Sequence, residues 1–157
     1  MKLKKFVLSG AAVAALCGVA YAQRPAAGAA ATIQARQGNY KQIAAALHEI
    51  VEQLHADTPD IARIRPRAAL LADRSVRVLT WFPRGTGAEA GVRTRAKPEI
   101  WSNPAGFRRA GATFVVAARA LNAAAQAGDI ARIRAAFPGV TRACSNCHDT
   151  FRGPAQQ

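Results

Sequence analysis

Two thiols and an imidazole stand close together near the C-terminus. Residues 142–151 read RACSNCHDTF, in which Cys144, Cys147 and His148 form the pattern Cys-x-x-Cys-His. If the segment is helical, the three side chains project from one face, because they lie three and four residues apart. The thiols could then bond one edge of a porphyrin while the imidazole reaches its iron. In an exported chain this pattern is typical of covalent c-type haem attachment.

A disulfide and a zinc site are the alternatives for these residues, and both fit less well. A redox Cys-x-x-Cys pair needs the start of a helix in a β-α-β unit, and this chain shows no alternation of strand and helix patterns. A zinc site needs about four ligands. Beyond the motif, the exported chain offers only His48 and His55. We therefore expect one covalently attached haem c, with His148 as the iron ligand.

The N-terminal sequence predicts export to the periplasm. Three lysines precede an apolar run at residues 6–19, and a small-x-small cleavage pattern follows at residues 20–22. We expect residues 1–22 to be a cleaved signal peptide and residues 23–157 to form a single haem domain. A lipid anchor on Cys17 is disfavoured, because a bulky leucine precedes it inside the apolar run. No later apolar run is long enough to span a membrane.

Four stretches of helical periodicity predict an all-α protein, an antiparallel up-down-up-down four-helix bundle, and no strand pattern competes with them. A long connection over residues 83–102 separates the second helix from the third. The first predicted helix begins at Thr32, after a loose leader at residues 23–31, and the second runs from the cap Thr58-Pro59 to Phe82 with a kink or late start at Pro66. The third runs from the cap Asn103-Pro104 to Gly128. The fourth runs from Asp129 to about Arg152, with a break at Pro138-Gly139.

Early residues of the first helix should face the haem, because the end of the fourth helix lies beside them in this topology. Arg36 occupies a core position, where a charge needs a partner, and arginine suits the carboxylates of haem propionates. The alternative is a side chain that snorkels at the bundle end. Tyr40 lies one turn further on and is expected over the iron, which is compatible with a role as a core aromatic.

No strong sixth iron ligand is evident in the exported chain. Many c-type cytochromes use methionine, and the only methionine, Met1, would leave with the signal peptide. His48 lies about 12 Å along the helix from Tyr40 and His55 lies further away, so we expect both to be ordinary surface histidines. A neutral phenol is a weak ligand. We therefore predict five-coordinate, high-spin iron with a crowded distal side that admits small neutral gases.

These motifs together resemble those of cytochrome c′, the class II c-type cytochromes, which are themselves up-down bundles. The similarity covers about residues 31–152 and rests on the C-terminal Cys-x-x-Cys-His with Phe151-Arg152, on ARQGNYK, and on GAEAGVRTRAKPEIWS. The resemblance implies these roles: thioethers at Cys144 and Cys147, His148 as proximal ligand, Arg36 and Gln37 near the propionates, Tyr40 over the distal face, Arg152 beside His148, and Thr94 and Arg95 near the haem edge.

The resemblance also implies binding of nitric oxide and carbon monoxide, and a homodimer through the first two helices, although several arginines of the second helix leave that interface open. No second catalytic group is evident near the iron, so we expect no enzyme. The alternatives are a six-coordinate, low-spin electron carrier and a haem-free helical binding module. The net charge of +13 suits an acidic redox partner. Export and the lack of clustered basic runs argue against nucleic acid.

Overall fold

The structure, a computed structural model, describes residues 20–154, with side chains described from residue 28 onward. Most of the predicted signal peptide, residues 1–19, therefore lies outside the described residues. The described elements, in chain order, are α1 (Ala20–His55), α2 (Ile61–Ser75), η1 (Val78–Trp81), η2 (Ala88–Ala90), α3 (Glu99–Ser102), α4 (Pro104–Ala127) and α5 (Ile130–Phe151).

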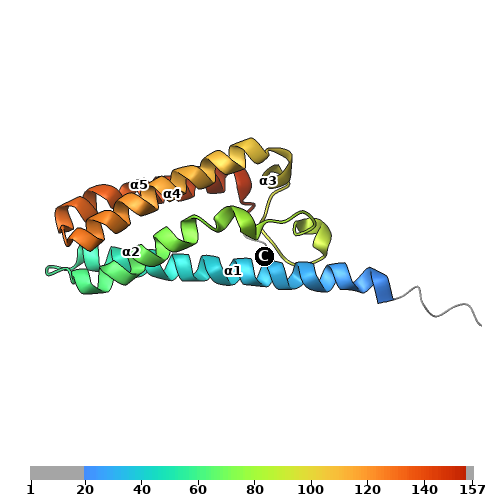
Figure 1. Cartoon of the computed structure of the whole chain (residues 1–157), viewed down its shortest axis with the longest axis horizontal. Helices are drawn as coiled ribbons and strands as arrows, with labels where there is room; N and C mark the ends of the chain where they lie inside the picture. Colours follow the sequence, from blue (N-terminus) through green and yellow to red (C-terminus); the bar gives the residue numbers. More distant parts are fainter. Residues whose placement is uncertain (1–19, 155–157) are drawn as a thin grey trace, which may run out of the picture.

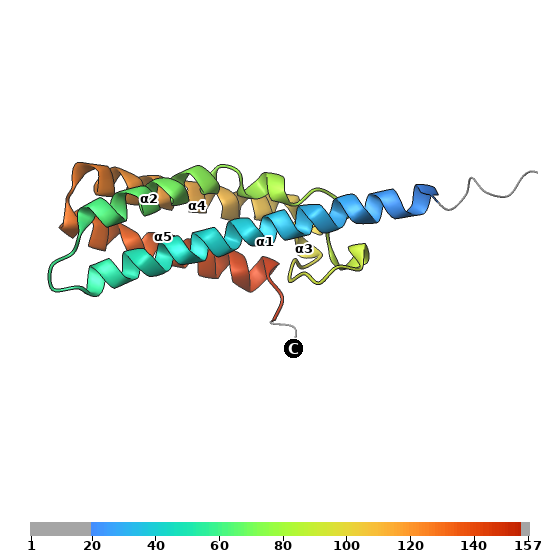
Figure 2. The ribbon, with the colours of Figure 1, turned by 90° about the horizontal axis from the view of Figure 1, so that it is seen from below.

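The four long helices form the antiparallel bundle that the sequence predicts (Figure 1). Helix α1 packs on α2, α2 packs on α4, and α4 packs on α5. The fourth side of the bundle differs, because the backbones of α1 and α5 scarcely approach each other within the described residues. The N-terminal part of α1 continues past the end of the bundle (Figure 2). The α1–α5 side is therefore where the bundle is held open.

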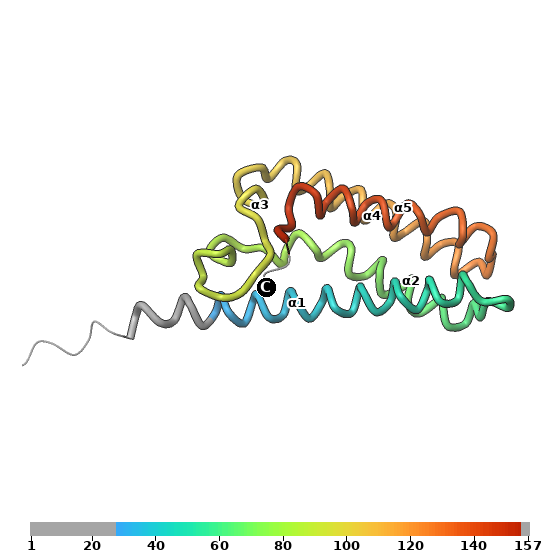
Figure 3. The backbone as a smooth tube through the Cα atoms, turned by 180° about the vertical axis from the view of Figure 1, so that it is seen from behind, coloured from blue at the N-terminus to red at the C-terminus, as the bar shows by residue number. Residues whose placement is uncertain are grey.

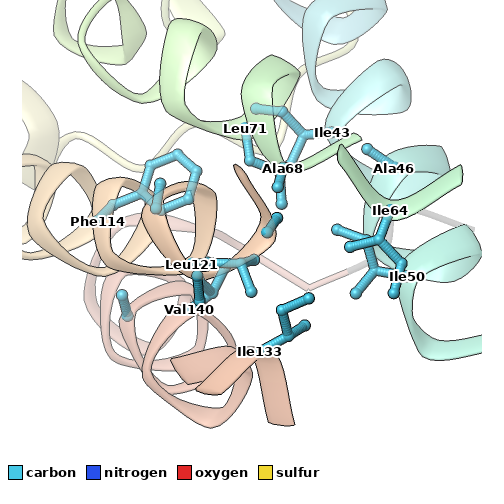
Figure 4. Close-up of a cluster of buried hydrophobic side chains, with 14 residues drawn as sticks. Ile43, Ala46, Ile50, Ile64, Ala68, Leu71, Phe114, Leu121, Ile133 and Val140 are labelled. Atoms are coloured by element: carbon cyan, nitrogen blue, oxygen red, sulfur yellow. The ribbon is translucent and has the colours of Figure 1, made fainter. Parts of the chain in front are cut away.

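The core consists of the apolar stripes that the helical periodicity predicts. Each long helix contributes side chains that are buried in one shared cluster, and burial of each large apolar side chain stabilises the fold by roughly 1.5–3 kcal/mol. Figure 4 shows the larger members, which point from the four helices toward one another: Ile43, Ile50, Ile64, Leu71, Phe114, Leu121, Ile133 and Val140.

The start and end of α4 and the start of α5 are where the sequence predicts them. Asn103 caps α4, and its side-chain oxygen accepts a hydrogen bond from the Gly106 N–H at 3.0 Å. Gly128 ends α4 with a φ of +74°, a conformation that glycine adopts without strain. Asp129 then caps α5 and accepts from the Arg132 N–H at 3.0 Å. Local capping chemistry is thus sufficient to place this turn.

Two predicted helix starts are wrong. Residues 23–31 are not a loose leader but belong to α1, because their many alanines have the highest helix propensity. Thr58-Pro59 is not the cap of the second helix. Asp60 is the cap, and its carboxylate accepts from the Ala62 N–H at 2.9 Å. The shift arises because two potential caps lie close together, and an aspartate is a stronger helix cap than a threonine.

Two other predicted features of the helices also differ. Helix α2 continues through Pro66 and ends at Ser75, and the 3₁₀ helix η1 covers much of the remaining distance to Phe82. Helix α5 has no break at Pro138-Gly139 and runs through both residues. A proline inside a helix removes one backbone donor and crowds the preceding turn, but the fully buried Val140 that follows packs in the core. We infer that this packing outweighs the local preference for a break.

The connection between η1 and α4 is not a simple loop. It contains η2 and α3, and it folds between α1 and the C-terminal end of α5 (Figure 3). An isolated antiparallel bridge joins Ala96 to Arg152, and the Lys97 N–H donates to the Phe151 carbonyl at 3.1 Å. None of the helices in the described part of the chain has the length and apolar character that crossing a membrane requires.

Candidate haem-binding site

The Cys-x-x-Cys-His motif lies within the last turns of α5, so its three side chains share a helical face. Cys144 packs against the main core, and Cys147 packs against a second cluster formed by Ile100, Phe107 and Phe151. The two sulfurs are not bonded to each other. Burial raises the pKa of both thiols, and the neighbouring Cys144 raises that of Cys147 further.

The zinc alternative lacks ligands in the described part of the chain. No three His, Cys, Asp or Glu side chains gather there in a way that could hold a metal ion. His48 is exposed and lies 3.3 Å from the Glu52 carboxylate on the same helix, and His55 is also exposed. Both are ordinary surface histidines, as expected.

The surroundings of His148 favour its neutral imidazole form. Burial lowers its pKa, and the positive charges of Arg152 and Arg95 lower it further, while Asp149 acts in the opposite sense. The Arg152 Nη1 atom lies 3.5 Å from His148 Nδ1. A neutral imidazole is the form that binds iron. The structure therefore places Arg152 beside His148, as the resemblance implies.

Tyr40 projects from α1 toward the motif on α5. Its ring packs edge-on against Trp81 at a centroid distance of 5.3 Å and lies 6.4 Å from Phe82. Burial is the main cause that raises the pKa of Tyr40. The neighbouring Cys147 and Cys144 raise it further, whereas the charges of Arg36 and Arg152 lower it. The effect of both cysteines on Tyr40 indicates that these groups lie near one another across the open α1–α5 side of the bundle.

Arg36 is almost completely buried, with only 3% of its surface exposed. The interpretation as a snorkelling side chain is therefore wrong. Its Nη2 atom donates to the carbonyl of Thr86 and to Thr94 Oγ1, both at 2.9 Å, and its Nη1 atom donates to Thr86 Oγ1 at 3.1 Å. The guanidinium also lies over the Phe82 ring, 4.5 Å from its centroid.

The buried Arg36 charge lacks a counter-charge among the described residues. All of its hydrogen-bond acceptors there are hydroxyl or carbonyl oxygens, and no carboxylate forms an ion pair with it. Burial lowers the pKa of Arg36, because the charged form is taken out of water. A buried cation is costly unless an anion compensates it. An anionic group that enters the site next to Arg36 would supply that compensation.

The remaining predicted site residues, Gln37, Thr94 and Arg95, form hydrogen bonds with other residues of the chain. Gln37 Nε2 donates to the Arg93 carbonyl at 2.9 Å. Arg95 Nε donates to the Gly153 carbonyl at 2.8 Å, and Thr94 is buried against Arg36. These three residues thus hold the connection in place around the site.

Sequence reasoning does not single out Thr86, although it takes two of the hydrogen bonds of Arg36. Thr86 is 3% exposed and lies in an irregular, glycine-rich stretch that has no periodicity to mark it as buried. No local sequence signal identifies it, because Thr86 lies 50 residues from Arg36 along the chain. The sequence marks Phe82 only as the end of the second predicted helix and not as the ring under Arg36.

These residues fit a haem c group. The thiol pair and the imidazole share one face of α5. Aromatic rings of Tyr40, Trp81 and Phe82 line the opposite wall. The buried guanidinium of Arg36 would be stabilised there by an anionic group. The backbones of α1 and α5 are separated on the side where these groups meet. The donor set of two thiols and one imidazole is the one that covalent haem attachment requires.

Comparison with known proteins supports the same assignment. A sequence model for the family described as "Cytochrome C'" matches residues 31–152. Cytochrome c′ from Rubrivivax gelatinosus is 36% identical over 121 residues, which cover 76% of this chain and 92% of that protein. A crystal structure of cytochrome c′ from the same organism superposes with a TM-score of 0.72 at 34% identity, covering 79% of this chain and 96% of the other.

Two further solved structures are similar and carry information about ligands or assembly. A nitric oxide complex of a mutant cytochrome c prime from Alcaligenes xylosoxidans has a TM-score of 0.71 at 30% identity, and covers 79% of this chain and 94% of its own. A cytochrome c′ described as having ligand-controlled dimer dissociation has a TM-score of 0.74 at 25% identity, with coverages of 80% and 97%.

Proposed function

Because the chain belongs to the cytochrome c′ family, whose members carry covalently attached haem c, we propose that it is a periplasmic haem protein that binds nitric oxide and carbon monoxide at five-coordinate, high-spin iron. The observation that carries this proposal is the contrast between the two walls of the site. His148 on α5 is a neutral imidazole, whereas α1 presents Tyr40, a buried neutral phenol.

Residues of both α5 and α1 would hold the haem. Cys144 and Cys147 supply the thioether sulfurs, and His148 supplies the proximal nitrogen. Arg36, buried and without an anionic partner among the described residues, pairs with a propionate, and Gln37 lies beside it on the same helix. When bound, the haem would supply an iron atom that can bind a small gas. Arg152 lies close to the proximal imidazole.

Tyr40 and its aromatic neighbours control access to the side of the site that faces His148. The rings of Trp81 and Phe82 both pack against Tyr40, and this apolar crowding disfavours water and bulky ligands more than it disfavours diatomic gases. The raised pKa of Tyr40 keeps its hydroxyl protonated, and a protonated phenol is a poor iron ligand. The related nitric oxide complex from Alcaligenes xylosoxidans supports gas binding as the function.

Optical absorption of the purified protein tests this proposal. The ferrous spectrum should be that of high-spin iron and should change on addition of carbon monoxide. A low-spin ferrous spectrum that does not change on addition of carbon monoxide would support the electron-carrier alternative instead. A denaturing gel that shows no covalent haem, after expression with haem-attachment machinery, would support the haem-free binding module. We propose no enzymatic activity, because we identify no second catalytic group beside the motif among the described residues.

We also propose that the signal peptide, residues 1–22, is removed on export, that residues 23–157 act as one domain, and that the mature chain forms a homodimer through α1 and α2. The charges of three α2 arginines are already paired, because Arg63 and Arg67 pair with Glu49 and Arg74 pairs with Asp73. The related cytochrome c′ with ligand-controlled dimer dissociation supports a dimer. Sedimentation velocity with and without carbon monoxide would measure the association.

An acidic redox protein is the partner that the charge of the chain favours. The net charge is +13 for the full sequence and +10 without the three lysines of the signal peptide, and complementary charge accelerates encounter. Electron transfer to an acidic partner should slow as the salt concentration rises, because salt screens the attraction.

A further inference from the structure

A short segment of the connection, residues 93–97, bonds to both walls of the candidate site. We call it the bridging segment. On the α1 side, Gln37 Nε2 donates to the Arg93 carbonyl at 2.9 Å and Arg36 Nη2 donates to Thr94 Oγ1 at 2.9 Å. Figure 3 shows the connection lying between α1 and the end of α5.

On the α5 side, the same segment is joined to the residues that follow His148. The Lys97 N–H donates to the Phe151 carbonyl at 3.1 Å, the Gly153 N–H donates to the Arg95 carbonyl at 2.8 Å, and Arg95 Nε donates to the Gly153 carbonyl at 2.8 Å. These bonds fix the backbone immediately after the turn that carries the proximal ligand.

Thr94 is the residue at which the two sets of bonds meet. Its side chain is buried, with 8% of its surface exposed. The Thr94 hydroxyl oxygen accepts from Arg36 Nη2 and also from the Ala96 N–H at 3.2 Å. Ala96 is the residue that bridges to Arg152, and the Arg152 N–H donates to the His148 carbonyl at 3.0 Å. The hydrogen bonds of this bridge are made by the flanking residues Lys97 and Gly153, so hydrogen bonds and short steps along the backbone together connect Arg36 to the proximal turn.

Thr86 provides a natural contrast within the same site. Its hydroxyl accepts from Arg36 Nη1 at 3.1 Å and donates to the Pro83 carbonyl at 2.7 Å. Within the described residues, the bonds of Thr86 remain among Arg36 and the first part of the connection, and none of them reaches α5. Both threonines thus hold Arg36, but only Thr94 also belongs to the bridging segment.

We propose that Thr94 is a positioning residue that couples Arg36 on α1 to the proximal turn of α5 through the bridging segment. This inference rests on the proposed haem function, in which Arg36 binds a propionate and His148 binds the iron. A change at one wall then alters the other, and the coupling is reciprocal, since a coupling free energy between two sites acts equally in both directions.

The first test compares Thr94→Val with Thr86→Val in the haem-loaded protein by hydrogen exchange and mass spectrometry. Each substitution removes one hydroxyl acceptor from Arg36 with almost no change in shape. In Thr94→Val, peptides that contain the Lys97 and Gly153 amides should exchange about tenfold faster than in wild type, because the link that orders them is lost. Thr86→Val should leave those peptides unchanged. Peptides from α4 report any general loss of stability in both variants.

The second test measures the iron–histidine stretching vibration of the ferrous protein by resonance Raman spectroscopy. Thr94→Val should shift this frequency, and Thr86→Val should leave it at the wild-type value. Arg95→Lys keeps the positive charge but loses the Nε–H that bonds Gly153, so it should shift the frequency as well. The double variant should then shift it little further, because both substitutions interrupt the same link.

The outcomes separate this inference from the proposed function. Equal exchange and equal frequency in wild type and Thr94→Val would overturn the coupling, and so would identical changes in the two threonine variants, since both would then report only a loosened Arg36. A wild-type protein without covalent haem would instead overturn the proposed function, and the exchange comparison would still decide whether Thr94 orders the proximal turn.

Discussion

At the scale of single residues, the candidate site depends on two side chains of α1 with opposite character. Arg36 is a buried charge that lacks an anion among the described residues, and Tyr40 is a buried phenol whose pKa is raised. The sequence predicts both as site residues, because a charged residue interrupts an apolar stripe and an aromatic one follows it by a turn. It does not predict Thr86 and Thr94 as the acceptors of Arg36, since those contacts bridge at least 50 residues of chain.

Replacement of Arg36 by methionine should destabilise the protein by about 2–3 kcal/mol, because it leaves several buried acceptors without a donor. It should also lower the haem reduction potential, since a nearby positive charge favours the reduced, less positive iron. Urea denaturation and redox titration measure the two effects. Arg119→Met, at an exposed position of α4, is the matched control and should change stability by less than about 0.5 kcal/mol. Equal effects of the two substitutions would contradict the role of Arg36.

Replacement of Tyr40 by alanine should increase the rate of carbon monoxide association by about tenfold or more, which corresponds to a barrier lowered by about 1.4 kcal/mol. The reason is that the phenol ring and its aromatic neighbours crowd the side of the site where the gas would bind. Flash photolysis measures the rate. Tyr40→Phe keeps the ring and should stay close to wild type. If alanine binds carbon monoxide no faster than phenylalanine does, Tyr40 does not limit access.

The raised pKa of Tyr40 predicts a loss of stability at alkaline pH. In the unfolded chain a tyrosine ionises near pH ~10, whereas burial keeps Tyr40 protonated to higher pH in the folded chain. The contribution is therefore fully present below about pH 10 and is lost as pH rises toward the folded pKa, by up to about 1.4 kcal/mol per pH unit. Tyr40→Phe removes this contribution. Urea denaturation of the ferrous protein between pH ~9 and ~11 should show a steeper decline for wild type, and parallel curves would contradict the burial of Tyr40.

At the scale of elements, local chemistry predicts helix ends better than it predicts helix interiors. Asn103, Gly128 and Asp129 act where the sequence places them, because each makes its capping interaction within three or four residues. Pro138 was wrongly expected to break the last helix, since core packing on either side is not visible locally. The path of the connection could not be predicted either. It is set by hydrogen bonds to α1 and to the end of α5.

Two glycine-to-alanine substitutions should have opposite effects on stability. Gly38 lies inside α1 with nothing within 4 Å of an added Cβ, so Gly38→Ala should stabilise by up to about 1 kcal/mol through helix propensity. Gly128 has a φ of +74°, which strains any residue with a Cβ, so Gly128→Ala should destabilise by about 1 kcal/mol or more. Thermal unfolding measures both. Destabilisation by Gly38→Ala would mean that a group held in the site lies against that position.

At the scale of the whole molecule, the bundle closes on three sides and stays open on the fourth. Helices α1 and α2, α2 and α4, and α4 and α5 pack closely, while α1 and α5 remain apart. His148 and the two cysteines lie on one wall of that open side, and Arg36 and Tyr40 lie on the other. The sequence predicts this juxtaposition from topology alone, because the end of the fourth helix must return to the early part of the first.

The spin state of the ferric protein tests the central claim most directly, because it reports whether any protein side chain binds the iron opposite His148. Electron paramagnetic resonance of the purified protein at neutral pH measures it. We predict a high-spin signal, which Tyr40→Phe leaves unchanged, since the phenol is not a ligand. A dominant low-spin signal from the wild-type protein without added ligand would show that a second strong donor holds the iron, and it would contradict the account.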